Sequence, residues 1–110
     1  MKHYKILLSL FLLSHLYSQE DFIDDLEYGK KLYENPRGIS CKACHGDKGE
    51  GKLIATYKTR NKEKQLFAPS IRHLSYEDFA QNINSSKGVM PKYYLTEKEI
   101  EAIFKFLQSL

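Results

Sequence analysis

Apolar residues recur at helical spacing in the last part of the chain. Within residues 96–110, Thr96 and Glu99 form the pattern of a capping box, and a run of apolar positions then shares one face (Ile100, Ile103, Phe104 and Leu107). The charged residues Lys98, Glu101 and Lys105 fall on the opposite side. This pattern predicts a C-terminal helix that buries its apolar face against another element.

A second helix is predicted over residues 21–34. Phe22, Leu26, Gly29 and Tyr33 share one face, acidic residues occupy the first turn (Asp21, Asp24 and Asp25), and residues 35–38 read Asn-Pro-Arg-Gly and stop the helix. Glycine is costly inside a helix unless another backbone approaches closely. We therefore expect the C-terminal helix to cross this one at Gly29.

The middle of the chain predicts one more helix and a loop. Ser75 is a suitable N-cap for a helix that ends near Asn84. Residues 52–68 have few apolar anchors and many positive charges (Lys52, Lys58, Arg60, Lys62 and Lys64, against Glu63). We expect an irregular surface loop with one short helical turn, whose charges form either a solvated face or a docking patch for an acidic partner. The predicted fold class is thus all-α.

Two cysteines and a histidine form the most specific motif, Cys41-Lys42-Ala43-Cys44-His45. This spacing is typical of covalent attachment of a c-type haem, because one helical turn presents both thiols to the porphyrin edge and the next side chain to the iron. The alternative of a redox-active dithiol would need a βαβ context, and the sequence pattern shows none. A structural zinc site would need four ligands, and only His73 and carboxylates remain to complete one.

Residues 1–18 have the pattern of a secretory signal peptide, which leaves a single domain over residues 19–110. The alternative is an uncleaved anchor, although the apolar run is short for a membrane span. After cleavage Met90 is the one methionine, and it follows His45 by 45 residues. Met90 is therefore the expected second ligand of the iron, next to a stiffening Pro91, with His73 as the rival. A net charge of +3 does not favour nucleic-acid binding.

Taken together, the order and spacing of these residues resemble a small class I cytochrome c over residues 26–110. The resemblance rests on Gly29, Tyr33, the Cys41–His45 motif with Gly46, Ala68-Pro69, Met90-Pro91 and the terminal helix with Phe106-Leu107. It implies an all-α fold in which the first and last helices cross beside one covalently bound haem c. It also implies that His45 and Met90 ligate the iron and that the Pro69 carbonyl accepts a hydrogen bond from the other nitrogen of His45.

The expected function is that of a one-electron carrier and not of an enzyme, because an iron closed by imidazole and thioether has no open site. We expect a periplasmic monomer in a respiratory or related electron-transfer chain. Its partners would be redox proteins, including a membrane oxidase or reductase. The alternatives are a peroxidase-like haem enzyme with a labile sixth ligand and a haem subunit of a larger oxidase.

Overall fold

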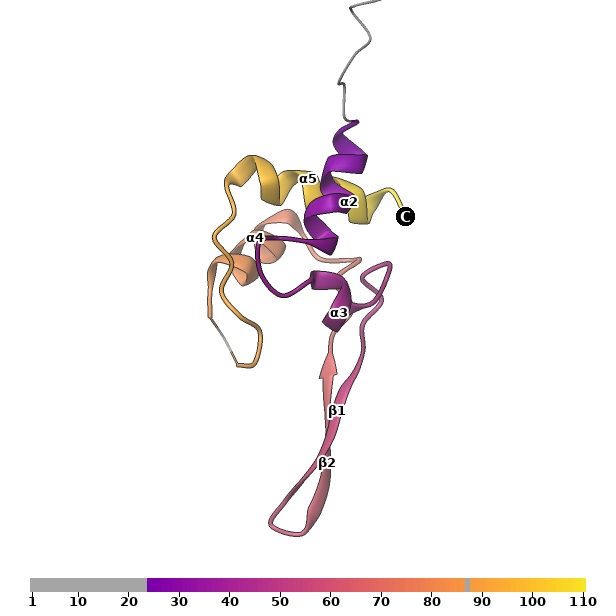
Figure 1. The fold of residues 1–110 in the computed structure, drawn as a ribbon, viewed down its shortest axis with the longest axis vertical. Coiled ribbons are helices and arrows are strands. Elements are labelled where there is room, and N and C mark those ends of the chain that lie inside the picture. Colours follow the sequence, from indigo (N-terminus) through magenta and orange to yellow (C-terminus); the bar gives the residue numbers. More distant parts are fainter. Residues whose placement is uncertain (1–23, 87) are drawn as a thin grey trace, which may run out of the picture.

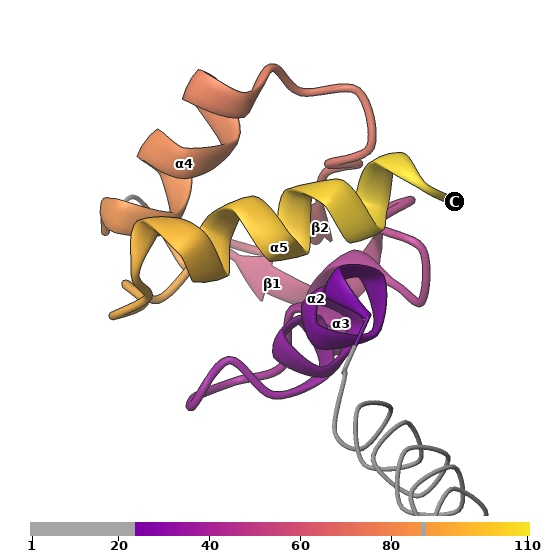
Figure 2. The ribbon, with the colours of Figure 1, turned by 90° about the horizontal axis from the view of Figure 1, so that it is seen from above.

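Two helices from opposite ends of the described chain form the frame of the molecule. The computed structural model describes residues 24–86 and 88–110, so the predicted signal peptide lies outside the described residues. Helix α2 (Asp25–Glu34) and helix α5 (Glu97–Gln108) lie against each other. Figure 1 shows the two helices together, and in Figure 2 α5 runs across an end-on view of α2.

Each of these helices begins at a capping residue. The Asp24 side chain accepts a hydrogen bond from the Leu26 amide at 3.3 Å. At α5, Thr96 accepts from the Glu99 amide at 3.2 Å and Glu99 accepts from the Thr96 amide at 2.9 Å, so the predicted capping box is confirmed. The first helix was expected to begin at residue 21; α2 begins at Asp25, and residues 21–23 lie outside the described part.

Gly29 is the point at which α2 and α5 approach each other, as the sequence predicted. A Cβ atom at this position would lie 2.0 Å from the Ala102 carbonyl oxygen and 2.9 Å from the Phe106 Cβ. Both distances are shorter than any van der Waals contact, so only glycine permits this crossing. The core on either side of it is formed by Leu32, Tyr33, Ile103 and Leu107, among others.

Helix α4 (Tyr76–Asn84) covers another part of α5. The Ser75 side chain accepts a hydrogen bond from the Asp78 amide, which confirms the predicted N-cap. The Phe104 ring of α5 packs between two aromatic rings of α4, with centroid distances of 5.4 Å to Tyr76 and 5.6 Å to Phe79. Within the described residues, none of the helices combines the length and apolar character needed to cross a bilayer.

Residues 52–68 form a β-hairpin, so the expected irregular loop is wrong, and the fold adds a small two-stranded sheet to the predicted helices. Strand β1 (Lys52–Thr59) pairs antiparallel with β2 (Lys62–Ala68), and Thr59 lies opposite Lys62. Arg60 and Asn61 form the two-residue turn, with φ angles of 52° and 62°. Positive φ at both central residues matches the twist of the two strands. Figure 1 shows this hairpin projecting from the helical body.

The sequence of the hairpin lacks the alternation of apolar and polar residues that predicts a strand, because neither face packs on a core. Nearly all its side chains are exposed, and a bulge between Leu53 and Ala55 interrupts the alternation of the two faces. Strand prediction relies on an apolar face that repeats every second residue. That signal is absent here, although residues 54–59 are rich in β-branched and aromatic side chains.

Candidate functional site

Helix α3 (Cys41–His45) is a single turn that contains the whole cysteine–histidine motif. Cys41 and Cys44 are free thiols, each half-buried, and Cys41 packs against the core cluster. Gly46 ends the helix with a φ of 88°, a conformation that L side chains rarely adopt. The turn therefore presents both sulfurs and the imidazole from one short segment.

His45 is buried, and its imidazole is held in one orientation. Its Nδ1 lies 2.8 Å from the carbonyl oxygen of Pro69, and the residue is only 8% exposed. A carbonyl oxygen can only accept, so Nδ1 carries the proton and donates it. The lone pair is then on Nε2, the nitrogen that remains available to a metal. This is the contact that the resemblance implied for Pro69.

The hairpin positions the Pro69 carbonyl. The Gly51 amide donates to the His45 carbonyl at 2.7 Å just before β1, and the Ile71 amide donates to the Gly49 carbonyl at 2.8 Å just after β2. A Cβ at Gly51 would lie 2.7 Å from the Ala68 carbonyl oxygen. The two ends of the hairpin are thus joined at its base, and Pro69 lies at that junction.

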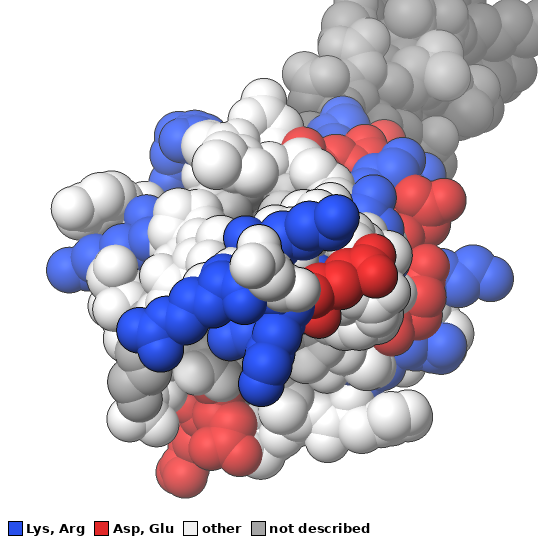
Figure 3. Space-filling view, turned by 90° about the horizontal axis from the view of Figure 1, so that it is seen from below, with Lys and Arg blue, Asp and Glu red and all other residues white. Residues whose placement is uncertain are grey.

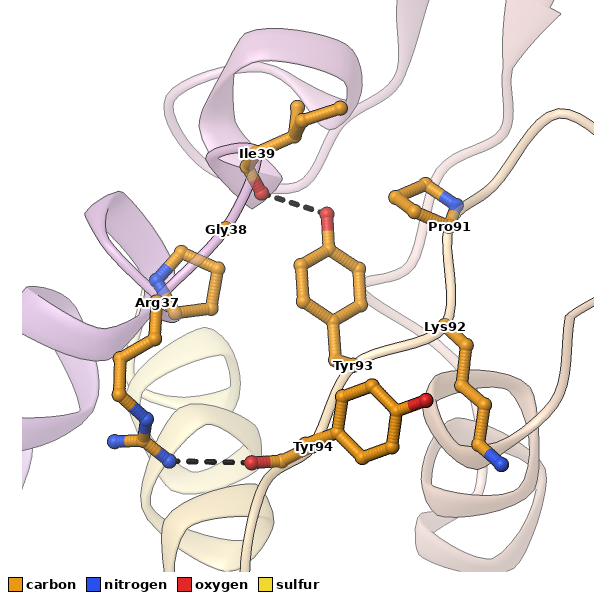
Figure 4. Close-up of a pocket in the computed structure, with 8 residues that line it drawn as sticks. Arg37, Gly38, Ile39, Pro91, Lys92, Tyr93 and Tyr94 are labelled. Carbon is orange, nitrogen blue, oxygen red and sulfur yellow. Dashed lines mark hydrogen bonds between the residues drawn. The ribbon is translucent and has the colours of Figure 1, made fainter.

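Two tyrosines fix the chain on either side of α3. The buried Tyr33 hydroxyl donates to the Gly46 carbonyl, directly after His45. The Tyr93 hydroxyl donates to the Ile39 carbonyl at 2.6 Å, before Cys41 (Figure 4). Burial raises the pKa of both phenols, that of Tyr93 to about 12, so both remain donors at neutral pH. The sequence analysis placed Tyr33 on a buried helix face but missed both hydrogen bonds, since neither follows from periodicity.

Arg37 ties the segment before the motif to the start of α5. Its guanidinium donates two hydrogen bonds to the Glu99 carboxylate, at 2.7 and 2.8 Å. It donates a third to the Tyr94 carbonyl at 3.2 Å (Figure 4). The Arg37 hydrogen bonds lower the pKa of Glu99 to about 2. Arg37 and Tyr94 line a hollow of about 270 Å³, together with Ile39, Pro91 and Tyr93 among others (Figure 4).

Met90 lies in the loop between α4 and α5, half-buried and in contact with the core cluster. Both this loop and α3 lie below the α2–α5 pair in Figure 1. Val89, the neighbour of Met90, is 70% exposed. Ile39, which lies two residues before Cys41, is 58% exposed. Apolar side chains are therefore available beside the thiols and beside the thioether. His73, the rival ligand, is exposed in the turn before α4.

The two other interpretations of the motif find no support in this geometry. Burial raises the pKa of the Cys41 thiol to about 11, whereas a redox-active dithiol depends on a lowered pKa. In the described part of the chain, no three or more His, Cys, Asp and Glu residues come together as a metal site. A structural zinc ion would need four such ligands.

The family model described as cytochrome c matches residues 26–110. The chain belongs to the cytochrome c family. No curated protein and no solved structure shows a significant match to it. As a cytochrome c, the protein carries a covalently bound haem c with its iron, and its chemistry is haem-based electron transfer. Cytochromes c are generally electron carriers rather than enzymes, and their domains are typically extracytoplasmic.

The residues of this cytochrome c fit such a haem. The two free thiols on one turn can form the two thioether bonds, and the Nε2 lone pair of the oriented His45 imidazole can bind iron. The fold differs from an all-helical one in its β-hairpin, inserted between His45 and Pro69. Because the base of the hairpin is joined, this insertion keeps the His45–Pro69 hydrogen bond intact.

Proposed function

We propose that this cytochrome c is a one-electron carrier whose haem iron is ligated by His45 and Met90. The observation that carries the proposal is the buried His45 imidazole, with Nδ1 bound to the Pro69 carbonyl at 2.8 Å. That hydrogen bond fixes the tautomer and ring orientation and increases the basicity of the ligating nitrogen. Met90 is half-buried in the loop between α4 and α5, and its thioether sulfur is the proposed second ligand of the iron.

With His45 and Met90 as ligands, the iron would have no open position, so the centre would exchange electrons and would not bind oxygen or peroxide. Ligation by histidine and methionine also raises the reduction potential relative to other axial pairs. The packed frame around α3, with Tyr33 and Tyr93 holding its two sides, keeps the ligands in place when the charge of the centre changes. A small rearrangement makes electron transfer fast.

The setting is the second part of the proposal. We place the carrier in the periplasm, as a monomer in a respiratory or related chain that exchanges electrons with membrane oxidases or reductases. The extracytoplasmic character of the family supports this location, and so does the export pattern of residues 1–18, which lie outside the described residues. Mass spectrometry of the exported protein tests it: we expect one haem and an N-terminus near residue 19.

Visible spectra and a redox titration of the holoprotein test the ligand assignment. We expect a weak band at the red edge of the visible spectrum in the ferric state, which marks thioether ligation. Met90→Ala should abolish this band and lower the reduction potential. His73→Ala is the matched control and should change neither. A high-spin ferric spectrum of the unaltered protein would show an open iron position and would favour the enzyme alternative.

A further inference from the structure

The hairpin arm, residues Lys52–Ala68, is an element without a packing partner over most of its length. Its strands pair only with each other within the described residues, and β1 meets the rest of the molecule at α3. A two-stranded hairpin is at best marginally stable alone in water. Leu53 and Phe67, which lie opposite each other near its base, are 43% and 59% exposed. Such an element gains stability when another surface covers it.

The arm carries the excess positive charge of the protein. Five cations against Glu63 give it a net charge of +4, whereas the whole chain has +3. Figure 3 looks onto the end of the arm and shows the Lys and Arg side chains gathered there. Three of them, Arg60, Lys62 and Lys64, line with Thr59 a hollow of about 420 Å³. No ion pair of the described residues involves any cation of the arm.

The distribution of these charges selects the kind of partner. Lys64 lies opposite Tyr57 on one face of the ribbon, and Lys58 lies opposite Glu63 on the other. An element that lies in a membrane interface needs one continuous apolar face, and toward the tip of this arm both faces and the turn carry charged side chains. A second copy of the chain would bring two net charges of +4 together. A protein surface rich in carboxylates complements the charge on all sides of the tip.

The arm is also attached next to His45, the proposed ligand of the iron. It leaves the body after Gly51, whose amide donates to the His45 carbonyl, and returns at Pro69, whose carbonyl accepts from the His45 imidazole. The exposed Leu53 and Phe67 at its base lie near this junction, and the cations lie farther out. Apolar contact at the centre with charges at the rim is the usual composition of a protein–protein interface.

From these observations we infer that the hairpin arm is the docking element for the redox partner, and that its basic tip inserts between carboxylates of that protein. This inference rests on the proposed carrier function, because the partner is defined by electron exchange. The ion pairs steer the encounter and fix the orientation, and the apolar base limits the approach to the side of α3.

Binding of the holoprotein to poly-L-glutamate, followed by NMR at low ionic strength, tests the inference. The triple variant Arg60→Gln, Lys62→Gln, Lys64→Gln is compared with Lys30→Gln, Lys98→Gln, Lys105→Gln, whose three lysines are exposed on α2 and α5. Each triple variant removes three positive charges, so both have the same net charge. The amide spectrum also shows whether the hairpin still forms.

We expect the shifted amides to cluster between residues 57 and 64. The hairpin variant should bind about tenfold more weakly, because it loses three exposed ion pairs that each contribute only modestly, and the α2/α5 variant should change affinity less than about twofold. Equal weakening in both variants would overturn the inference, because net charge alone would then explain binding. Hairpin-dependent binding to phosphatidylglycerol vesicles without binding to poly-L-glutamate would overturn it in favour of a lipid surface.

This outcome is independent of the iron ligation. The visible spectrum of the same samples reports on Met90, so a failed ligand assignment appears in the spectrum while the titration still reports on the arm. A normal spectrum with no preference for the hairpin would leave the carrier function intact and remove the docking role.

Discussion

Replacing Gly29 with alanine tests the crossing of α2 and α5, on which the rest of the fold depends. The new Cβ would lie 2.0 Å from the Ala102 carbonyl oxygen and 2.7 Å from the Ala102 carbonyl carbon. Both are backbone atoms, so no side-chain rotation can relieve the overlap. The two helices must move apart by more than about 1 Å to restore an ordinary contact distance.

That separation determines the size of the effect. A gap of this size loses a quarter to a half of the dispersion energy between the facing side chains, and overpacked cores are typically destabilised by about 1–3 kcal/mol, occasionally more. The buried Leu32, Ile103 and Leu107 lie in the affected core. Alanine recovers about 1 kcal/mol of helix propensity. Because the overlap is with backbone atoms, the upper end of the overpacking range, about 3 kcal/mol, applies, and we expect a net loss of about 2 kcal/mol in the free energy of unfolding.

Denaturant unfolding of the holoprotein, followed by far-UV circular dichroism, measures this loss. For a domain of this size, a loss of 2 kcal/mol lowers Tm by about 8–16 °C. Gly38→Ala is the matched control, because Gly38 has ordinary φ and its Cβ would approach nothing closer than Tyr93 Cε1 at 3.5 Å. If Gly29→Ala costs no more than Gly38→Ala, the close approach of the two helices is not what stabilises the fold.

Two further substitutions test the contacts around the motif. Tyr33→Phe leaves the Gly46 carbonyl without its buried donor and should lower the free energy of unfolding by about 1–2 kcal/mol, measured by denaturant titration, while Tyr94→Phe, at an 82% exposed residue, should change nothing. Because Glu99 has a folded-state pKa of about 2 against a usual value of 4.5, its stabilisation is complete above pH 4.5 and is lost as the pH falls towards 2. Arg37→Gln should therefore reduce the loss of stability in that acid range, measured by Tm against pH; an unchanged slope would contradict the role of the ion pair.

The helical frame was predictable because its sequence signals are local. The Thr96–Glu99 box and the Ser75 N-cap are fixed by neighbouring residues, and both are confirmed. Gly29 could be predicted as a crossing point because a glycine on an apolar helix face has a cost that only a close neighbour compensates. The haem-attachment motif Cys41–His45 was also predictable, since covalent attachment requires two cysteines separated by two residues and followed by histidine.

The contacts that orient the site were less predictable, because they join distant parts of the chain. Nothing in the local pattern of Arg37 indicates that it binds Glu99, and nothing around Tyr93 indicates its bond to the Ile39 carbonyl. The hairpin was missed because its strands bury neither face, so burial imposes no alternation on them. Its turn also lacks glycine: Arg60 and Asn61 adopt positive φ instead.

The joined base of the hairpin has a consequence for how proteins of this kind diversify. Since Gly51 and Pro69 are neighbours, the backbone path between them can be lengthened, shortened or exchanged without moving the carbonyl that binds His45. Chain closure penalises added length only weakly. Recognition of a partner by the hairpin arm can therefore change in evolution while the helices around the iron centre, which set its electronic properties, stay the same.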